Sequence, residues 1–214
     1  MSGHRRERLS RSRLYFVTDL RPDIEELVAQ ALTGGVDMVQ LRDKHASDAE
    51  LLDAAGCLRE RCREHEALFW VNDRPDLALA CGADGVHLGQ DDEPVPVVRE
   101  QVGPDMLIGL STHTPEQLRG AVSSGADQLS VGPVRETPTK PGRAAAGLSY
   151  VAHAARHAAG RPWFAIGGID LDNVHEVIDA GATRIVVVRA IRDAADPRAA
   201  AAAFARELAG GTGA

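Results

Sequence analysis

Short apolar runs alternate along the chain with longer stretches in which apolar residues recur at helical spacing. The apolar runs predict eight strands, at residues 14–18, 36–41, 68–71, 85–87, 107–109, 128–131, 163–166 and 184–188. The clearest helical patterns between and after them lie at residues 24–32, 48–64, 115–123, 171–180 and 198–208. This alternation predicts parallel strands that are joined by crossover helices.

A short repeated motif precedes every second strand. It consists of a glycine, a small residue and, in three of its four copies, an aspartate, at residues 35–37, 82–84, 125–127 and 181–183. Glycine fits the left-handed backbone position at which a helix ends and the chain turns into a strand. The four copies divide the chain into four βαβα quarters, and eight parallel strands close into a barrel. We therefore predict an α/β fold, a single-domain (β/α)8 TIM barrel; the alternative, a doubly wound open sheet, lacks a G-x-G-x-x-G motif after the first strand.

The length of 214 residues suits one domain with a full core. We expect the catalytic barrel at residues 14–209, with flexible tails at 1–13, which is basic, and 210–214, which is rich in glycine. No apolar run approaches the roughly 20 residues of a membrane span. Three cysteines without metal-ligand spacing indicate reduced thiols and a cytoplasmic location.

The net charge of −7 disfavours broad binding to nucleic acid or to anionic membranes, which requires a basic surface. Small anionic molecules remain suitable partners, because a local cluster of donors can oppose the global charge. A homo-oligomer is compatible with the sequence. Histidines and cysteines form no cluster with zinc spacing, and the chain has no Gly-x-Ser-x-Gly elbow for a serine nucleophile.

Residues that follow the predicted strands are nearly all polar or glycine, and in such barrels this end carries the active site. Only two lysines occur among the 24 basic residues, Lys44 and Lys140, and both lie in these loops. Of the two asparagines, Asn72 also lies there, whereas Asn173 does not. A lysine supplies a compact point charge for a phosphate, although chance placement is the alternative.

Two loops are candidate phosphate sites. The segment 136–143 combines Thr137, Thr139 and Lys140 with prolines that fix the backbone, which predicts a phosphate clamp; a rigid surface loop is the alternative. The pair Gly167 and Gly168 would let a phosphate approach backbone amides at a helix N-terminus, together with the loop after the eighth strand.

Carboxylates after the third and fourth strands form a candidate magnesium site. Asp73 and Asp92 would lie on adjacent strands, and magnesium favours one or two carboxylates together with phosphate oxygens of a substrate. Helix capping is the alternative for both residues. The spacing does not exclude Asp91.

Seven segments taken together resemble the thiamine-phosphate synthase family. They occur in family order between about residue 14 and residue 208, and they are YFVTD at 15–19, QLRDK at 40–44, VNDR at 71–74, GVHLGQDD at 85–92, GLSTH at 109–113, TPTKPG at 137–142 and AIGGI at 165–169. Each segment is weak by itself, and their order makes the set specific.

The resemblance implies a transferase of thiamine biosynthesis that condenses a hydroxymethylpyrimidine diphosphate with a thiazole phosphate, or its carboxylated tautomer, and releases pyrophosphate. It implies contacts to the pyrimidine diphosphate from Gln40, Arg42, Lys44, Asn72, Ser111 and Lys140. Among these, Lys140, Ser111 and Arg42 would act in catalysis. It implies one Mg²⁺ per active site on Asp73 and Asp92, and contacts to the thiazole phosphate from Thr137, Thr139, Gly168, Val188 and Arg189.

Two positions depart from the family pattern. Arg135 stands where an apolar residue is common, and Arg189 stands where serine is common, so the contact at the thiazole phosphate could come from the arginine side chain or from backbone amides alone. The implied mechanism is a dissociative substitution at the pyrimidine methylene, driven by positioning and electrostatics. The rival functions are a thiazole tautomerase, a Schiff-base aldolase and a non-catalytic sensor of phosphate ligands.

Overall fold

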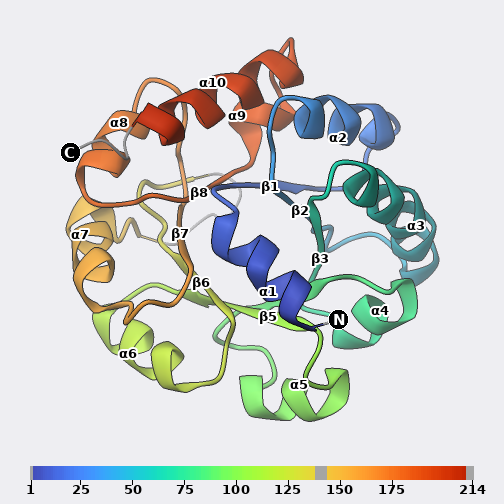
Figure 1. Cartoon of the computed structure of the whole chain (residues 1–214), viewed down its shortest axis with the longest axis horizontal. Coiled ribbons are helices and arrows are strands. Elements are labelled where there is room, and N and C mark those ends of the chain that lie inside the picture. The colour runs from blue at the N-terminus through green and yellow to red at the C-terminus, as the bar shows by residue number, and fades with distance from the viewer. Residues whose placement is uncertain (1, 138–143, 211–214) are drawn as a thin grey trace.

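A closed barrel of eight parallel strands forms the centre of the protein (Figure 1). The computed structural model describes residues 2–137 and 144–210. The strands are β1 (Leu14–Thr18), β2 (Met38–Leu41), β3 (Leu68–Asn72), β4 (Gly85–Leu88), β5 (Leu107–Thr112), β6 (Gln128–Val131), β7 (Trp163–Ile166) and β8 (Ile185–Val187). They pair in sequence order, and β8 closes the ring on β1. The predicted (β/α)8 barrel is therefore confirmed.

Helices surround the barrel and cover its outer face (Figure 1). They are α2 (Ile24–Thr33), α3 (Asp48–Glu64), α4 (Pro75–Cys81), α5 (Val95–Val102), α6 (Pro115–Ser123), α7 (Gly147–His157), α8 (Val174–Asp179), α9 (Arg189–Arg192) and α10 (Pro197–Gly210). Their apolar positions pack on the outer side chains of the strands in one continuous core. The bounds of α3 and α6 agree with the helical periodicity of the sequence, because an amphipathic pattern of this length is unambiguous.

Most predicted bounds agree with the structure to within two residues, and two differ by three. The sequence predicted a helix from residue 171, but α8 begins at Val174, because Asp170 and Asn173 bond to each other in a turn that precedes it. The strand predicted at 107–109 continues to Thr112, whose hydroxyl donates to Ser130 O on the adjacent strand β6.

The repeated glycine motif forms the junctions at the end of the barrel where the strands begin. Its glycines at 35, 82, 125 and 181 all have positive φ, between 66° and 103°. The aspartate of each complete copy then accepts a hydrogen bond from a backbone amide of the preceding strand or its first residue. Asp37 accepts from Leu14 N at 2.9 Å, Asp84 from Phe69 N at 3.1 Å and Asp127 from Ile108 N at 2.9 Å.

Helix α1 (Ser2–Arg11) lies across that same end of the barrel (Figure 1). This differs from the flexible tail expected at residues 1–13. Leu9 is buried in the barrel interior, and arginines of α1 pair with the repeat aspartates: Arg5 and Arg8 with Asp84, and Arg6 with Asp127. The helix is held by partners that are far away in sequence, so local periodicity could not reveal it. The expected tail at 210–214 lies outside the described residues, apart from Gly210 at the end of α10.

The barrel interior changes from apolar to polar along its axis. Large rings, among them Tyr15, Trp70 and Phe164, fill the part near α1. Gly85 makes room for the indole, since a Cβ there would lie 2.6 Å from Trp70 ring carbons. Buried polar side chains also face the interior, and they are Gln40, His87, Ser111, Gln128 and Ser130. The interior therefore closes one end of the barrel and supplies polar groups toward the other.

All three cysteines lie in described segments, and Cys57, Cys62 and Cys81 are free thiols. Burial raises the pKa of the Cys62 and Cys81 thiols, so neither is a reactive thiolate at neutral pH. Over residues 2–137 and 144–210, no helix has the length and apolar character needed to cross a membrane.

Candidate active site

The loop after β2 presents two cations at the open end of the barrel. Asp43, which stands between Arg42 and Lys44, fixes this loop by accepting hydrogen bonds from His45 N at 2.8 Å and Ala46 N at 3.2 Å. These bonds, first the one from His45 N, lower the pKa of the Asp43 carboxyl and keep it ionised. Arg42 is half-buried and Lys44 is exposed, so both charges remain available to a ligand.

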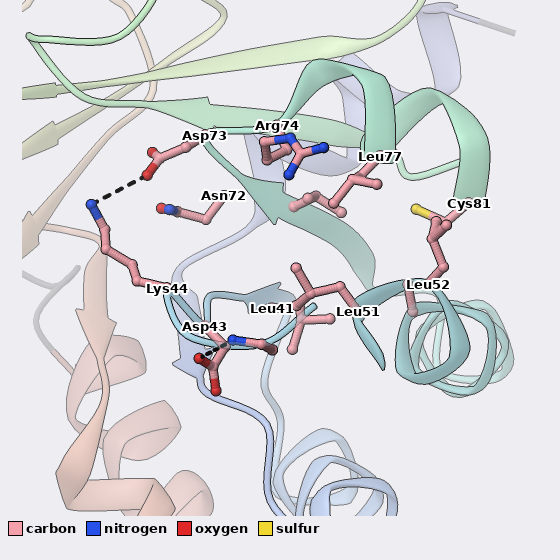
Figure 2. A pocket seen from close by; sticks show the side chains of 13 residues that line it. Leu41, Asp43, Lys44, Leu51, Leu52, Asn72, Asp73, Arg74, Leu77 and Cys81 are labelled. Carbon is pink, nitrogen blue, oxygen red and sulfur yellow. Dashed lines mark hydrogen bonds and ion pairs between the residues drawn. The ribbon is translucent and has the colours of Figure 1, made fainter. Parts of the chain in front are cut away.

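Lys44 reaches across to the end of β3. Its Nζ lies 3.6 Å from Asp73 Oδ2, and Asn72 lies between the two loops (Figure 2). Asp73 has φ of 59°, a left-handed conformation that aspartate tolerates better than most residues, and its backbone amide donates to His87 O at 2.8 Å. The chain therefore turns at the end of β3, and the Asp73 carboxylate faces the Lys44 ammonium group in the loop after β2.

Asp73 and Asp92 form a pair of neighbouring carboxyl groups. Asp92 is folded back toward β4 because its Oδ2 accepts a hydrogen bond from Gly89 N at 2.6 Å. Burial raises the pKa of the Asp73 carboxyl, and the nearby Asp92 raises it further, while Lys44 and Arg42 oppose this effect. Asp91, which the sequence could not exclude, is exposed. Two neighbouring carboxyl groups, one of them with a raised pKa, match a site for a divalent cation.

In the described segments, no group of three or more histidine, cysteine, aspartate or glutamate side chains converges as a complete metal site. The predicted magnesium ion therefore stays a prediction. A pair of protein carboxylates is nevertheless what magnesium usually takes from a protein when substrate phosphates and water supply the other ligands.

Gln40 and Ser111 are buried inside the barrel, and Ser111 also lines a cavity at its open end. The Gln40 side chain is 3% exposed and donates to the Tyr15 hydroxyl, whose pKa is raised by burial, so that the phenol stays neutral. Ser111 Oγ lies 2.9 Å from His87 Nε2, and Gln90 donates to Ser111 O at 2.6 Å. Tyr15 of β1 thus holds the Gln40 side chain. His87 of β4 and Gln90 of the following loop hold Ser111.

A second cavity opens across the ends of β5 to β8. Its volume is about 350 Å³, and its lining includes Ser111, His113, Thr137, Ile166, Gly168, Val188 and Arg189. The backbone of Gly168 approaches the neighbouring loop closely, since a Cβ there would lie 2.8 Å from Arg135 Cβ. With φ of 67°, the position also requires a left-handed backbone. This cavity shares Ser111 with the polar barrel interior.

Asn173 holds the loop that carries Gly168, and the sequence analysis assigned it no role. Its side chain is 8% exposed, donates to Gly168 O at 2.9 Å and accepts from Asp170 N at 3.2 Å. Both hydrogen bonds keep the turn after β7 in one conformation. The signal that could have found it is composition, because asparagine occurs only twice in the chain.

Arg135 and Arg189, the two positions that depart from the family pattern, have different surroundings. Arg135 turns to Glu176 on α8, with a 2.6 Å ion pair, and is exposed. Arg189 is exposed at the start of α9 and lines both the second cavity and the neighbouring cationic one that contains Arg42 and Lys44. Of the predicted clamp, Thr137 is half-buried in the cavity lining, whereas Thr139 and Lys140 lie outside the described residues.

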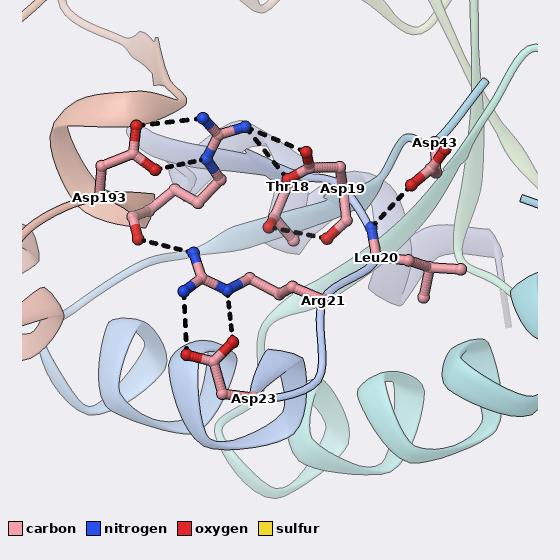
Figure 3. A network of polar contacts seen from close by, with 8 residues as sticks. Thr18, Asp19, Leu20, Arg21, Asp23, Asp43 and Asp193 are labelled. Atoms are coloured by element: carbon pink, nitrogen blue, oxygen red, sulfur yellow. Dashed lines mark hydrogen bonds and ion pairs between the residues drawn. The ribbon is translucent and has the colours of Figure 1, made fainter. Parts of the chain in front are cut away.

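A polar network between β1 and α9 was also not predicted as part of the site (Figure 3). Arg192 Nη1 donates to both carboxylate oxygens of Asp19, at 3.1 and 3.2 Å, and its Nε and Nη2 donate to Asp193. Asp19 follows β1 and was recognised only as a polar strand-end residue. The ion pair joins residues 173 positions apart, and no local pattern indicates such a contact.

The fold and these loops define a (β/α)8 barrel protein with a ligand site at the carboxyl ends of its strands. The model of the family described as thiamine monophosphate synthase matches residues 14–191, and the chain belongs to this family. The resemblance inferred from the seven segments is therefore confirmed.

Individual relatives agree with this assignment. A thiamine-phosphate synthase of Saccharopolyspora erythraea is 53% identical over 213 residues, covering 95% of this chain and 96% of the relative. One of Gloeobacter violaceus is 54% identical over 206 residues, covering 96% of this chain; the chain spans only 60% of that relative's length. The solved structure of a thiamine phosphate pyrophosphorylase from Pyrococcus furiosus superposes with a TM-score of 0.87 at 37% identity, covering 97% of this chain and 99% of that one.

Proposed function

We propose that this protein is a cytoplasmic thiamine-phosphate synthase, which joins a hydroxymethylpyrimidine diphosphate to a thiazole phosphate and releases pyrophosphate. One observation supports this most directly: a cation and carboxylate cluster at β2 to β4 adjoins a separate cavity at β5 to β8, with Ser111 between them. A condensation of two anionic substrates needs two such neighbouring subsites. The substrates are small molecules, and we expect a homo-oligomer to be compatible with the site.

Magnesium fits the carboxylate pair. Asp73 and Asp92 would hold one ion, because their carboxyl groups are neighbours and a cation would offset the burial and the charge repulsion that raise the pKa of Asp73. When bound, the ion would neutralise charge that develops on the diphosphate as it leaves.

The side chains of this protein would act mainly by binding and orientation. Arg42 and Lys44 would hold the diphosphate together with Lys140, which follows β6 in the sequence. Asn72 at the end of β3 and Gln40 inside the barrel would orient the pyrimidine. The Ser111 hydroxyl would donate to an oxygen of the leaving group. His87 Nε2 lies 2.9 Å from Ser111 Oγ and would hold the hydroxyl in place by donating to it.

The thiazole phosphate would bind in the cavity at β5 to β8. Gly168 and Val188 would offer backbone amides, and Thr137 and Thr139 would offer hydroxyls. Arg189 would add a charge at the cavity mouth, where it is exposed. The thiazole nitrogen would then attack the pyrimidine methylene after the carbon–oxygen bond has largely broken, and the enclosing loops would exclude water from the cation-like centre.

A pyrophosphate-release assay tests this function. The purified chain, both substrates and magnesium should yield pyrophosphate and thiamine phosphate in equal amounts, and removal of the metal with a chelator should stop both. Binding of both substrates without turnover would favour a sensor. Failure to bind the pyrimidine diphosphate would favour a thiazole tautomerase.

A further inference from the structure

We propose that Arg192 is a positioning residue that ties the two substrate subsites together, an inference that rests on the proposed function. Its guanidinium lies between Asp19 after β1 and Asp193 after α9, and uses three of its nitrogens for these two carboxylates (Figure 3). The Arg192 side chain is 22% exposed, whereas the two carboxylates are about half exposed. The arginine is thus the least exposed member of the group that it joins.

On the thiazole side, Arg192 fixes a helix that could not hold its shape alone. Helix α9 has four residues, too few for an isolated helix to be stable. Arg192 N donates to Val188 O at 2.9 Å, and Arg192 O accepts from Arg21 Nη1 at 3.1 Å. Ile191, which is fully buried, supplies the apolar anchor of the same turn. These backbone contacts shape the turn, and the Arg192 side chain ties the turn to Asp19. Together they set where the backbone of Val188 and Arg189 faces the cavity.

On the diphosphate side, the connection continues through the loop after β1. Asp19 accepts from Arg192, and the next residue, Leu20, donates its backbone amide to Asp43 Oδ2 at 3.2 Å. The other oxygen of Asp43 accepts from His45 N and so fixes the loop that carries Lys44. A continuous series of hydrogen bonds and backbone links therefore runs from the Lys44 loop to the turn at Val188.

Arginine is required for this connection because its planar group can serve two carboxylates at once, which a lysine ammonium cannot do with the same geometry. Because the carboxylates are about half exposed, solvent screens the ion pairs and they add little to the stability of the fold. Loss of the connection should therefore appear in substrate binding rather than in melting temperature.

The test compares Arg192→Gln with Arg63→Gln in the full chain. Arg63 is a matched control because it makes an ion pair with Glu60 on the outer surface of α3, so the charge change is the same. We expect Arg192→Gln to raise the KM for the thiazole phosphate about tenfold with little change in melting temperature, and Arg63→Gln to leave it unchanged. Equal kinetics of the two variants would overturn the proposal.

The connection between subsites is tested by combining Arg192→Gln with Asp43→Asn. The two side chains do not touch, so independent residues would give losses in kcat/KM that multiply. We expect the double variant to lose clearly less than that product, and multiplied losses would contradict the proposed link. If Arg192→Gln does not fold, Asp19→Asn removes the same ion pair and takes its place.

The outcome can be separated from failure of the proposed function. If the unmodified protein does not form thiamine phosphate, the proposed function is wrong, and binding of inorganic phosphate and of pyrophosphate becomes the readout. Weaker phosphate binding by Arg192→Gln than by Arg63→Gln would still support the positioning role, and equal binding would refute it.

Discussion

The carboxyl groups of Asp73 and Asp92 are neighbours in a partly buried site, although they come from loops after different strands. Two carboxylates are an unfavourable pair in a partly buried site, and the pKa of Asp73 is raised first by burial and then by Asp92. A fold retains such a pair at a cost in stability, and a bound cation offsets that cost. This relationship leads to the first two predictions.

Asp73→Asn should separate stability from activity. It removes a carboxylate whose ionisation is disfavoured in the folded protein, so the metal-free variant should melt at a higher temperature than the unmodified protein at pH 7. Its magnesium-dependent turnover should fall by about 100-fold, because one of the two proposed metal ligands is lost. A lower melting temperature together with unchanged turnover would show that the carboxylate has a structural role instead.

The pH dependence follows from the same shift. Because the folded pKa of Asp73 is above its unfolded value, Asp73 favours folding at low pH, and that contribution is lost as the pH rises through the folded pKa. Magnesium binding needs the ionised form, so it should weaken as the pH falls through that value, at a higher pH than for an ordinary aspartate. Metal titrations at several pH values check this, with Asp73→Asn as the control that removes the dependence.

Asp92→Asn should weaken magnesium dependence more than Asp91→Asn. The structure offers a reason, because Asp92 is turned inward by Gly89 N while Asp91 is exposed. Asp92→Asn should raise the magnesium concentration for half-maximal activity about tenfold or more, and Asp91→Asn should leave it nearly unchanged. The reverse order would assign the metal to Asp91.

Lys140→Ala should slow the chemical step while the fold stays intact. Its charge is proposed to stabilise the leaving pyrophosphate, so single-turnover rates should fall by about 100-fold. Arg135→Ala is the matched control, because Arg135 lies in the same segment between β6 and α7 but pairs with Glu176. Single-turnover rates equal to those of the control would remove Lys140 from the mechanism.

Gly168→Ala should raise the KM for the thiazole phosphate. Its added Cβ would meet Arg135 and would force a residue with a side chain into a left-handed backbone. Gly160→Ala is a close control, since Gly160 has φ of 73° with nothing within 4 Å of the added Cβ. Both variants should lose about 1–2 kcal/mol of stability from the backbone, and only Gly168→Ala should affect binding. A normal KM for Gly168→Ala would place the phosphate elsewhere.

Much of the fold could be predicted from local patterns. Strands such as β1 and β6 are short apolar runs bounded by turn residues, and their predicted bounds agree with the structure. The glycine repeat gave the number of barrel quarters, because a positive φ at each junction is a local requirement that nearly always selects glycine. Helix α1 was missed because its burial depends on Asp84 and Asp127, which are distant in sequence.

The sequence by itself determined the barrel, the edge at which polar residues gather and the family. Periodicity, turn glycines and strand-end residues are all properties of short segments, so they can be recognised before folding is known. The family resemblance had already favoured Asp92 over Asp91, and the tertiary structure supplied the physical reason, since Asp92 adjoins Asp73. Only the tertiary structure decided that Asn173 holds Gly168 and that Arg192 connects β1 to α9. These relationships depend on side-chain direction and on closure of β8 against β1, which no local pattern contains.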